Sequence, residues 1–448
     1  MRAEEARISI FGLGRVGLCL AVCYASRGFH VIGVDVDEHK LAVISRGEAP
    51  FYEPGLQELL AKALENGSLE LTSSAAEAVL GSDISFITVG TPSRPDGSVD
   101  LSQVEAVCRQ LGAALAEKKA WHLVVVRSTV PPGTTGGLVR ETLEQISGLK
   151  CGDGFGLCMN PEFLSEGAAI RGIMEPDRVV IGEHDRRSGD VLQAFYKAFH
   201  GPGCPPILRT TLVNAELIKY ASNAFLAMKI SFANMIARLC QRLPGADVVA
   251  VMNGVGLDKR IGRAFLNAGL GWGGSCFPKD LAALLWLGAQ MGVDLPLVKA
   301  TVDVNEGQPL VAVELAKQAL GDLKGKRVAL LGLAFKPGTD DIRDAISLRL
   351  IGALLAEGAK VVAYDPKAMD NVRALLGNTI SYASSALEAI RGADCCIIVT
   401  EWDEFRALRP EDFAEHMRRP VVIDGRRVFR PEDFEGAVEF YAVGRGPT

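Results

Sequence analysis

Short apolar runs rich in β-branched residues alternate with helical sequence from residue 7 to about residue 182. The runs are RISIF, HVIGVDVD, ISFITVG, HLVVVRSTV and RVVIGE. Strands that alternate with helices are typical of βαβ units, in which the strands pair in parallel and the helices cover the sheet. The pattern therefore predicts an α/β domain built on a doubly wound parallel sheet.

One long segment follows that contains neither glycine nor proline, from Thr210 to about Leu243. A single helix of about 32 residues would be roughly 48 Å long, which is long for one small domain. Its apolar residues go most of the way round the helix. We expect a spine that joins two domains or a dimer interface; the alternative is a buried helix of one domain.

A second alternation of strands and helices begins at Lys326. It runs through RVALLGLAF, a helix over residues 347–357, KVVAYDP, CCIIVT and VVID, and it predicts a second doubly wound sheet. Residues 296–321 lack strand signals, so we expect one linking helix there. With 448 residues and roughly 150 residues per domain, we predict three domains: 1–198, a central helical segment at 199–305, and 306–448.

Composition and charge exclude several classes of protein. A chain with 48% hydrophobic, 23% charged and 6% aromatic residues is not disordered, collagenous or a coiled coil. A net charge of −6 lacks the basic field of a nucleic-acid-binding protein. No apolar run reaches the length of a membrane span, and the N-terminus is too charged for a signal peptide, so we expect a cytoplasmic protein. The 10 cysteines form no CxxC pair, and we expect neither disulfides nor a metal.

A glycine fingerprint stands where the first predicted strand meets the first predicted helix. Gly12 permits the tight turn, Gly14 lets the backbone approach a pyrophosphate, and Gly17 lets helix and strand pack closely. The second strand ends at Asp35, where a carboxylate can accept both ribose hydroxyls and repels a 2′-phosphate, with Lys40 nearby. The first domain is therefore predicted to be a Rossmann domain that binds NAD rather than NADP, unless the glycines serve only the turn.

Cys276 has the surroundings of a reactive thiol. It follows the glycine-rich run GLGWGGS, and Pro278 suits the first turn of a helix. A helix N-terminus and the neighbouring Lys279 both favour the thiolate. The alternative is a small buried hydrophobic residue. A cysteine nucleophile combined with NAD indicates oxidation to the acid level, because a thiohemiacetal can lose hydride and leave a thioester that water hydrolyses.

Three further features each have two possible interpretations. Lys219 and Asn223 share one face of the long helix among apolar residues, so the lysine is either a proton carrier or a snorkelling interface residue. The segment NPEFLSEG places Glu162 and Glu166 four residues apart, which by itself could be a helix cap. Lys336, after GLAF, could hold a phosphate or lie on the surface.

Seven blocks, in order, resemble the UDP-glucose 6-dehydrogenase family within the wider UDP-glucose/GDP-mannose dehydrogenases. They are FGLGRVG, VGTPSRPDG, RSTVPPGT, NPEFLSEG, AELIKYASNAFLAMKISFAN, GLGWGGSCFPKD and FKPGTDDIRDA. The resemblance spans nearly the whole chain. It implies four-electron oxidation of the C6 alcohol of UDP-glucose to UDP-glucuronate with two NAD+, no metal, and a homodimer or larger homo-oligomer with a C-terminal UDP-sugar-binding domain.

The resemblance also implies roles for individual residues. Cys276 would be the nucleophile and Glu162 the base in thioester hydrolysis, with Thr129 helping to place the water. Protons and the developing oxyanion would be managed by Lys219, Asp280 and Asn223. The cofactor residues it implies are Gly12, Leu13, Gly14, Arg15, Val16, Gly17, Asp35, Lys40, Val89, Gly90, Thr91, Thr129, Glu166, Lys279 and Arg343.

The implied contacts of the nucleotide sugar come from both halves of the chain. They are Glu162, Phe163, Leu164, Ser165, Lys219, Asn223, Phe265, Leu266, Asn267, Gly269, Gly273, Phe277, Phe335 and Lys336. Arg260 in DKRIG matches an arginine that family members bring across a dimer interface, and Arg426 in IDGRR matches a further substrate contact.

Relatives with other substrates remain alternatives. GDP-mannose dehydrogenases resemble the chain, but GWGGSCFPKD followed by ALLWLGAQMG and VNEGQ looks closer to the UDP-glucose branch. N-acetylated UDP-sugar dehydrogenases usually differ after the cysteine. A further alternative is a regulatory protein that binds NAD and nucleotides without catalysis. Such a protein would lack Cys276, Lys219 or Asp280, and all three are present. Asn234 is followed by Met235 where the family commonly has Glu, which puts a hydrogen bond across the dimer contact in doubt.

Overall fold

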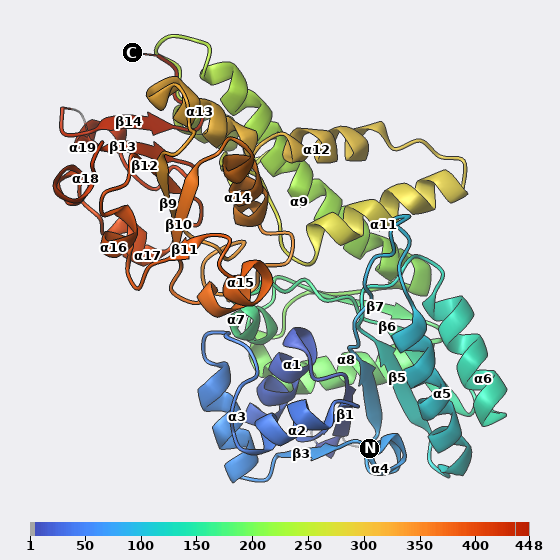
Figure 1. The fold of residues 1–448 in the computed structure, drawn as a ribbon. Helices are drawn as coiled ribbons and strands as arrows, with labels where there is room; N and C mark the ends of the chain where they lie inside the picture. Colours follow the sequence, from blue (N-terminus) through green and yellow to red (C-terminus); the bar gives the residue numbers. More distant parts are fainter. Residues whose placement is uncertain (1–4, 435, 448) are drawn as a thin grey trace. The chain divides into compact units, whose positions relative to one another are not determined.

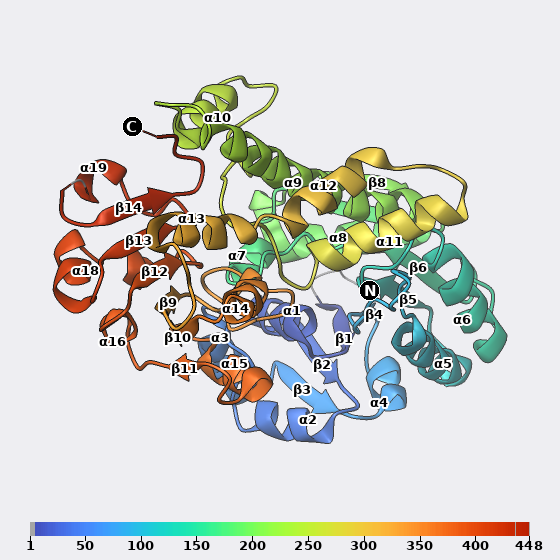
Figure 2. The same ribbon diagram turned by 45° about the horizontal axis from the view of Figure 1, so that its top comes forward.

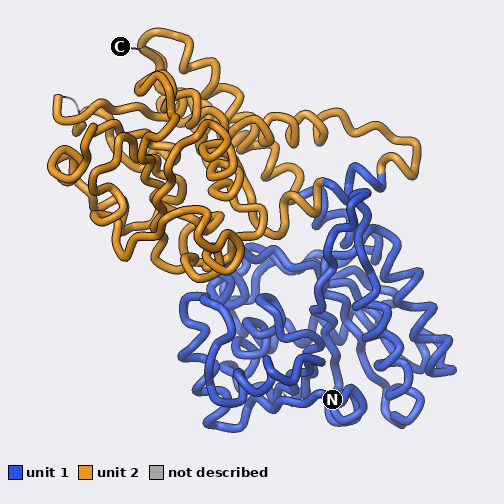
Figure 3. Tube along the Cα trace, in the orientation of Figure 1, with its two compact units in different colours: residues 1–222, 282–287 blue, residues 223–281, 288–448 orange. Residues whose placement is uncertain are grey.

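A computed structural model describes residues 5–434 and 436–447. The chain forms two compact units, coloured separately in Figure 3. Unit 1 is Met1–Ser222 with Ala282–Leu287, and unit 2 is Asn223–Leu281 with Gly288–Thr448. The three-domain division stays a prediction. Its outer ends lie outside the described residues, as do Arg2 and Glu4, two of the charged N-terminal residues that argue against a signal peptide.

Unit 1 is built on an eight-stranded sheet with the order β3-β2-β1-β4-β5-β6-β7-β8 (Figures 1 and 2). The predicted doubly wound sheet is confirmed, with one correction: β7 runs antiparallel to β6, with Met159 opposite Gly182. The helix between them, α7, has only six residues, and the ends of the two strands pair, Met159 with Gly182 and Cys158 with Glu183. The strands are β1 Arg7–Phe11, β2 His30–Val34, β3 Leu69–Thr72, β4 Ile84–Ile87, β5 His122–Val126, β6 Phe155–Met159, β7 Val179–Glu183 and β8 Ile207–Thr211.

Helices cover both faces of this sheet. Apolar residues of α1, α3, α7 and α8 pack on one face, and those of α4, α5 and α6 pack on the other together with the start of α9 (Figure 1). The helices are α1 Arg15–Ser26, α2 Glu38–Ser45, α3 Leu56–Glu65, α4 Ala75–Leu80, α5 Ser102–Glu117, α6 Arg140–Ser147, α7 Ala169–Met174, α8 Arg186–His200 and α9 Leu212–Cys240.

Unit 2 contains a six-stranded parallel sheet with the order β11-β10-β9-β12-β13-β14 (Figure 2). This confirms the second doubly wound sheet. Helices α13 and α14 pack on one face with the end of α9, and α16 and α18 pack on the other. The strands are β9 Arg327–Leu331, β10 Lys360–Tyr364, β11 Ser381–Tyr382, β12 Cys395–Ile398, β13 Val421–Asp424 and β14 Glu439–Ala442.

The remaining helices include α11, which like α9 contributes residues to both units. They are α10 Val248–Gly256, α11 Phe277–Gln290, α12 Pro296–Glu306, α13 Leu310–Leu320, α14 Ile346–Ala356, α15 Met369–Leu376, α16 Ala386–Ile390, α17 Asp403–Arg406, α18 Pro410–His416 and α19 Pro431–Phe434. Within the described ranges, no helix combines the length and the hydropathy that a membrane span requires.

Two predicted elements differ from the structure. The single helix expected over 296–321 is wrong: α12 and α13 are separate helices, because Gly307 and Pro309 interrupt the chain between them. The long helix is confirmed but begins at Leu212, since Thr210 and Thr211 still pair with β7.

Candidate functional site

The glycine turn between β1 and α1 has the conformation that its three glycines predict. Gly12 has φ +99°, and a Cβ on Gly17 would lie 1.9 Å from the carbonyl oxygen of Gly12. Both positions therefore exclude a side chain. A Cβ on Gly14, by contrast, would have no heavy atom within 4 Å. The turn is thus open at Gly14, directly before the N-terminus of α1, where a phosphate can approach the backbone.

Asp35 lies at the end of β2 and is held towards the glycine turn. Its Oδ2 accepts hydrogen bonds from the backbone N–H of Leu13 and from Nζ of Lys40, both at 2.8 Å. Burial acts to raise the pKa of Asp35, but the bonds from Lys40 and from the N–H groups of Asp37 and Leu13 outweigh it and lower the pKa. The carboxylate is therefore charged and can accept hydrogen bonds from hydroxyl groups.

These features fit a dinucleotide with a free 2′-hydroxyl. The open backbone at Gly14 suits a pyrophosphate, and the ionised Asp35 suits ribose hydroxyls while repelling a 2′-phosphate. Leu13 and Val16 belong to the same turn, and Val89, Gly90 and Thr91 follow the neighbouring strand β4. The hydroxyl of Thr91 donates to the carbonyl oxygen of Thr129 at 2.8 Å, which joins the loops after β4 and β5.

Glu162 and Lys219 form a buried ion pair in unit 1. The Nζ of Lys219 lies 2.8 Å from Oε1 of Glu162, and the two residues are 2% and 7% exposed. The other carboxylate oxygen accepts the backbone N–H of Leu164 at 2.6 Å. Lys219 is therefore not a snorkelling interface residue, because its ammonium group is buried within the chain, and Glu162 is not merely a helix cap. Burial acts to raise the pKa of Glu162, but Lys219, the Leu164 N–H and Arg127 together lower it.

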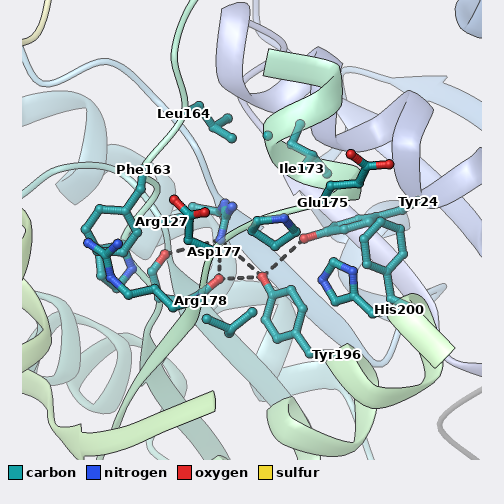
Figure 4. A pocket seen from close by; sticks show the side chains of 16 residues that line it. Tyr24, Arg127, Phe163, Leu164, Ile173, Glu175, Asp177, Arg178, Tyr196 and His200 are labelled. Carbon is teal, nitrogen blue, oxygen red and sulfur yellow. Dashed lines mark hydrogen bonds between the residues drawn. The ribbon is translucent and has the colours of Figure 1, made fainter. Parts of the chain in front are cut away.

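Sequence analysis missed a polar network beside Glu162 (Figure 4). Nη1 of Arg127 donates to Oδ1 of Asn160 and, at 3.1 Å, to the hydroxyl of Tyr196. Asn160 also donates through Nδ2 to the carbonyl oxygen of Val180 at 2.7 Å, which fixes the end of β6 two residues before Glu162. The only local signal was an arginine directly after an apolar strand, which by itself indicates a surface residue.

Two further buried glutamates brace loops that carry predicted residues. Glu53 accepts the backbone N–H groups of Gly167 and Ala169, both at 2.7 Å, and so holds the segment that contains Glu166. Glu216 accepts the N–H groups of Gly133 and Thr135 at 2.5 and 2.7 Å, after the loop that contains Thr129. No role was predicted for either residue from the sequence.

Arg15 contacts Glu166, with 3.8 Å between Nε of Arg15 and Oε2 of Glu166. The guanidinium of Arg15 also packs over the ring of Phe51. The predicted cofactor residues Arg15 and Glu166 are thus brought together. Phe163 packs against the guanidinium of Arg178, with 4.1 Å between the guanidinium carbon and the ring centroid.

Cys276 lies directly before α11 in unit 2. The backbone N–H of Asp280 donates to the Cys276 carbonyl oxygen at 2.9 Å, which closes the first turn of the helix, and Pro278 is its second residue. The predicted helix start is therefore confirmed. Asp280 is buried and accepts hydrogen bonds of 2.6 Å from both Asn223 Nδ2 and Lys279 Nζ. Hydrogen bonds thus join Asn223, Lys279 and Asp280, which we call the Asp280 cluster, one helical turn after Cys276.

Lys219 and Asn223 stand one turn apart on α9. The same helix therefore carries a member of the Glu162 pair and a member of the Asp280 cluster.

The predicted substrate loop before Cys276 packs against the loop after β9. A Cβ on Gly274 would lie 2.6 Å from the ring of Phe335, and one on Gly273 would lie 2.1 Å from the carbonyl oxygen of Asp344. Lys336 lies over the ring of Phe335 at 5.5 Å. The other loop members are Phe265 with φ +64°, buried Leu266, exposed Asn267, buried Gly269, and Phe277 at the start of α11.

The three predicted arginines of unit 2 differ in their surroundings. Arg426 donates to the carbonyl oxygen of Gly271 at 2.9 Å and is mostly buried, so it is not a solvated surface residue. The carbonyl oxygen of Arg343 accepts the N–H of Gly274, and its side chain pairs with Asp341. Arg260 is 89% exposed and pairs with Asp258.

Three family models match almost the whole chain. Residues 6–200 match the NAD-binding domain of the UDP-glucose/GDP-mannose dehydrogenase family, residues 213–307 its central domain, and residues 329–431 its UDP-binding domain. The chain belongs to the UDP-glucose/GDP-mannose dehydrogenase family. The predicted Rossmann domain is thereby confirmed as the NAD-binding domain of that family, and NAD as its cofactor.

Relatives in the UDP-glucose/GDP-mannose dehydrogenase family align over most of their length. The UDP-glucose 6-dehydrogenase AglM of Haloferax volcanii is 46% identical over 94% of this chain and 96% of its own. TuaD of Bacillus subtilis, also a UDP-glucose 6-dehydrogenase, is 40% identical over 98% and 93%. A solved UDP-glucose dehydrogenase of Pyrobaculum islandicum superimposes with a TM-score of 0.91 at 43% identity and covers 98% of both chains.

Proposed function

We propose that the protein oxidises UDP-glucose to UDP-glucuronate and reduces two NAD+ for each sugar. The observation that carries this proposal is Cys276 at the start of α11 beside the Asp280 cluster, in a chain that matches an NAD-binding and a UDP-binding domain. The full-length likeness to enzymes named UDP-glucose 6-dehydrogenases supports the choice of sugar.

The first oxidation takes the C6 alcohol to the aldehyde, and the second is proposed to proceed through a covalent adduct with Cys276. Oxidation of a C6 alcohol to a carboxylate removes four electrons and consumes one water. Each of the two successive oxidations transfers two electrons as hydride, and NAD+ supplies the acceptor. Cys276 adds through sulfur to the C6 aldehyde to give a thiohemiacetal, whose oxidation leaves a thioester. Water then cleaves the carbon–sulfur bond, which releases the acid and restores the thiol. Cys276 lies directly before the N-terminus of α11.

The ionised groups of the site are suited to the proton transfers. Glu162, whose pKa is lowered chiefly by Lys219 against the effect of burial, takes a proton from the hydrolytic water. Thr129 helps to place that water. Lys219 and Asn223 offer N–H donors to the developing oxyanion, and Asp280 fixes the amide of Asn223.

The proposal is tested by the ratio of NADH formed to nucleotide sugar consumed, with UDP-glucose, GDP-mannose and UDP-N-acetylglucosamine assayed in parallel. We expect two NADH for each UDP-glucose. Turnover of GDP-mannose alone would overturn the choice of sugar, and tight binding of all three sugars without NADH would indicate a silent nucleotide-binding protein.

Substitution of the cysteine tests the covalent step. In Cys276→Ser and Cys276→Ala we expect the formation of UDP-glucuronate to fall by at least about 1,000-fold, because no thioester can form, while calorimetry still detects UDP-glucose binding. Full turnover by either variant would contradict the covalent mechanism.

We also propose that the protein is a homodimer formed through α9. Large apolar side chains recur along this helix at intervals of seven or eight residues and are between 44% and 58% exposed: Leu217, Phe225, Phe232 and Leu239. A second copy of the same helix can cover such a stripe in a two-fold interface. Arg260, which is exposed and forms an ion pair with the neighbouring Asp258, is proposed to reach the partner's substrate site.

A further inference from the structure

Side-chain amides, rather than neighbouring strands, hold the backbone of the loop that leads to Cys276. Oδ1 of Asn234 accepts the N–H of Gly269 at 2.8 Å, and Nε2 of Gln308 donates to the Gly269 carbonyl oxygen at 2.7 Å. Asn305 accepts the N–H of Trp272 through Oδ1 and donates to its carbonyl oxygen through Nδ2, both at 2.8 Å. We call Asn234, Asn305 and Gln308 the amide clamp. It satisfies all four backbone groups of Gly269 and Trp272.

The amide clamp is buried, and Arg238 orients one of its members, Gln308. Its three side chains are at most 3% exposed. Nε of Arg238 donates to Oε1 of Gln308 at 2.8 Å, which directs the other end of this amide, Nε2, towards Gly269. A carboxamide offers a donor and an acceptor side by side on one planar group, and both bonds of Asn305 use this arrangement. Unpaired backbone groups in this interior would be costly.

The glycines of the loop are what allow the amide clamp to come close. Gly271 has φ +110°, and a Cβ there would lie 2.7 Å from Oδ1 of Asn305. A Cβ on Gly269 would lie 3.1 Å from the carbonyl oxygen of Gly425. The run GLGWGG therefore provides room for side chains that approach its backbone, and it need not be a flexible segment.

Two of the three clamp residues come from the segment VNEGQ, residues 304–308, at the junction of α12 and α13. This junction is the break that the sequence did not predict. Because the helix ends after Glu306, the side chains of Asn305 and Gln308 can both point to one loop.

We infer that Asn234, Asn305 and Gln308 are positioning residues that fix the nucleotide-sugar loop, residues 265–273, before the substrate binds. A loop that is already ordered loses less conformational entropy on binding, so the amide clamp strengthens binding of the nucleotide sugar without touching it. The same clamp holds Trp272, four residues before Cys276, and so steadies the start of α11. The identity of the ligand rests on the proposed function.

The inference is tested by hydrogen exchange and by kinetics on the full-length protein. In Asn305→Leu, a substitution of similar size, we expect amide exchange in a peptide covering residues 266–276 to accelerate at least tenfold. The KM for UDP-glucose should rise about tenfold or more, whereas the KM for NAD+ should change less than twofold. Gln308→Met should give the same pattern and serves as the second variant if Asn305→Leu does not fold.

Leu354→Ala is the matched control, because Leu354 is fully buried in the core of unit 2 on α14. We expect it to lower the melting temperature while leaving loop exchange and the KM for UDP-glucose unchanged. The inference is overturned if both clamp variants keep wild-type exchange, or if Leu354→Ala reproduces their rise in KM. If the wild-type protein does not oxidise UDP-glucose, the proposed function fails, and loop exchange alone still decides the role of the clamp.

Discussion

Two buried cations act on the carboxylate of Glu162. Lys219 contacts it directly at 2.8 Å, and Arg127 lies in the hydrogen-bonded network that fixes Asn160 two residues before it. Burial alone would raise the pKa of Glu162, and these two positive charges, with the N–H of Leu164, reverse that effect. The proposed base is therefore ionised because of side chains that are remote in sequence.

Removal of Arg127, the more distant of the two cations, should change the pH dependence of turnover. A general base works only when ionised, so turnover is lost as the pH falls through its pKa. Arg127→Met removes a positive charge and raises the pKa of Glu162, so we expect the acidic limb of kcat to move to higher pH. The measurement is kcat against pH at saturating substrate.

The control is Arg127→Lys, which retains the charge and should leave the acidic limb near its wild-type position even if kcat is reduced. An identical limb in Arg127→Met and the wild-type protein would show that Arg127 has only a structural role.

At the scale of elements, glycine has two different functions in the turn between β1 and α1: one glycine allows close packing, and another leaves the backbone accessible. Gly17 is required by packing, because a Cβ would lie 1.9 Å from the Gly12 carbonyl oxygen. Gly14 is not required by packing, because a Cβ there would meet no atom within 4 Å. Its open position is explained by the cofactor of the NAD-binding domain, whose pyrophosphate needs access to the backbone.

The pair Gly14→Ala and Gly17→Ala should therefore have different effects. We expect Gly14→Ala to melt like the wild-type protein but to bind NAD+ at least about tenfold more weakly, because the methyl group occupies the approach of the phosphates. Gly17→Ala should lower the free energy of unfolding by about 1–3 kcal/mol through overpacking. Thermal melting and calorimetric titration with NAD+ measure the two effects, and wild-type NAD+ affinity in Gly14→Ala would contradict the assignment.

At the scale of the whole molecule, the exposed apolar stripe of α9 requires a covering surface. Burial of a large apolar side chain contributes roughly 1.5–3 kcal/mol, and a two-fold interface buries each one twice. Phe225 and Phe232 lie in the middle of the stripe and are 58% and 44% exposed in the single chain. The homodimer proposal therefore depends most on these two residues.

The double substitution Phe225→Glu and Phe232→Glu should weaken the dimer by at least about 100-fold and give a monomer at micromolar concentration. Light scattering measures the mass. Leu375→Glu is the control, because Leu375 is equally exposed, at 60%, but lies on α15. A wild-type monomer, or a double variant that remains dimeric, would contradict the interface.

Local sequence determined the features that depend on neighbouring residues. The alternation of apolar runs predicted both sheets, the absence of glycine and proline predicted α9, and the glycine spacing predicted the cofactor turn. The position of Cys276 before a helix followed from the glycines and Pro278 around it. These features were predictable because backbone propensities and side-chain periodicity act over a few residues.

Tertiary structure alone decided the contacts between distant positions. Glu162 and Lys219 are 57 residues apart, and Trp272 and Asn305 are 33 apart, so no local pattern joins them. The reversal of β7 and the break between α12 and α13 likewise became visible only in the fold. Burial determines the outcome in each case: a charge or an amide removed from water needs a partner, and only packing brings that partner within hydrogen-bonding distance.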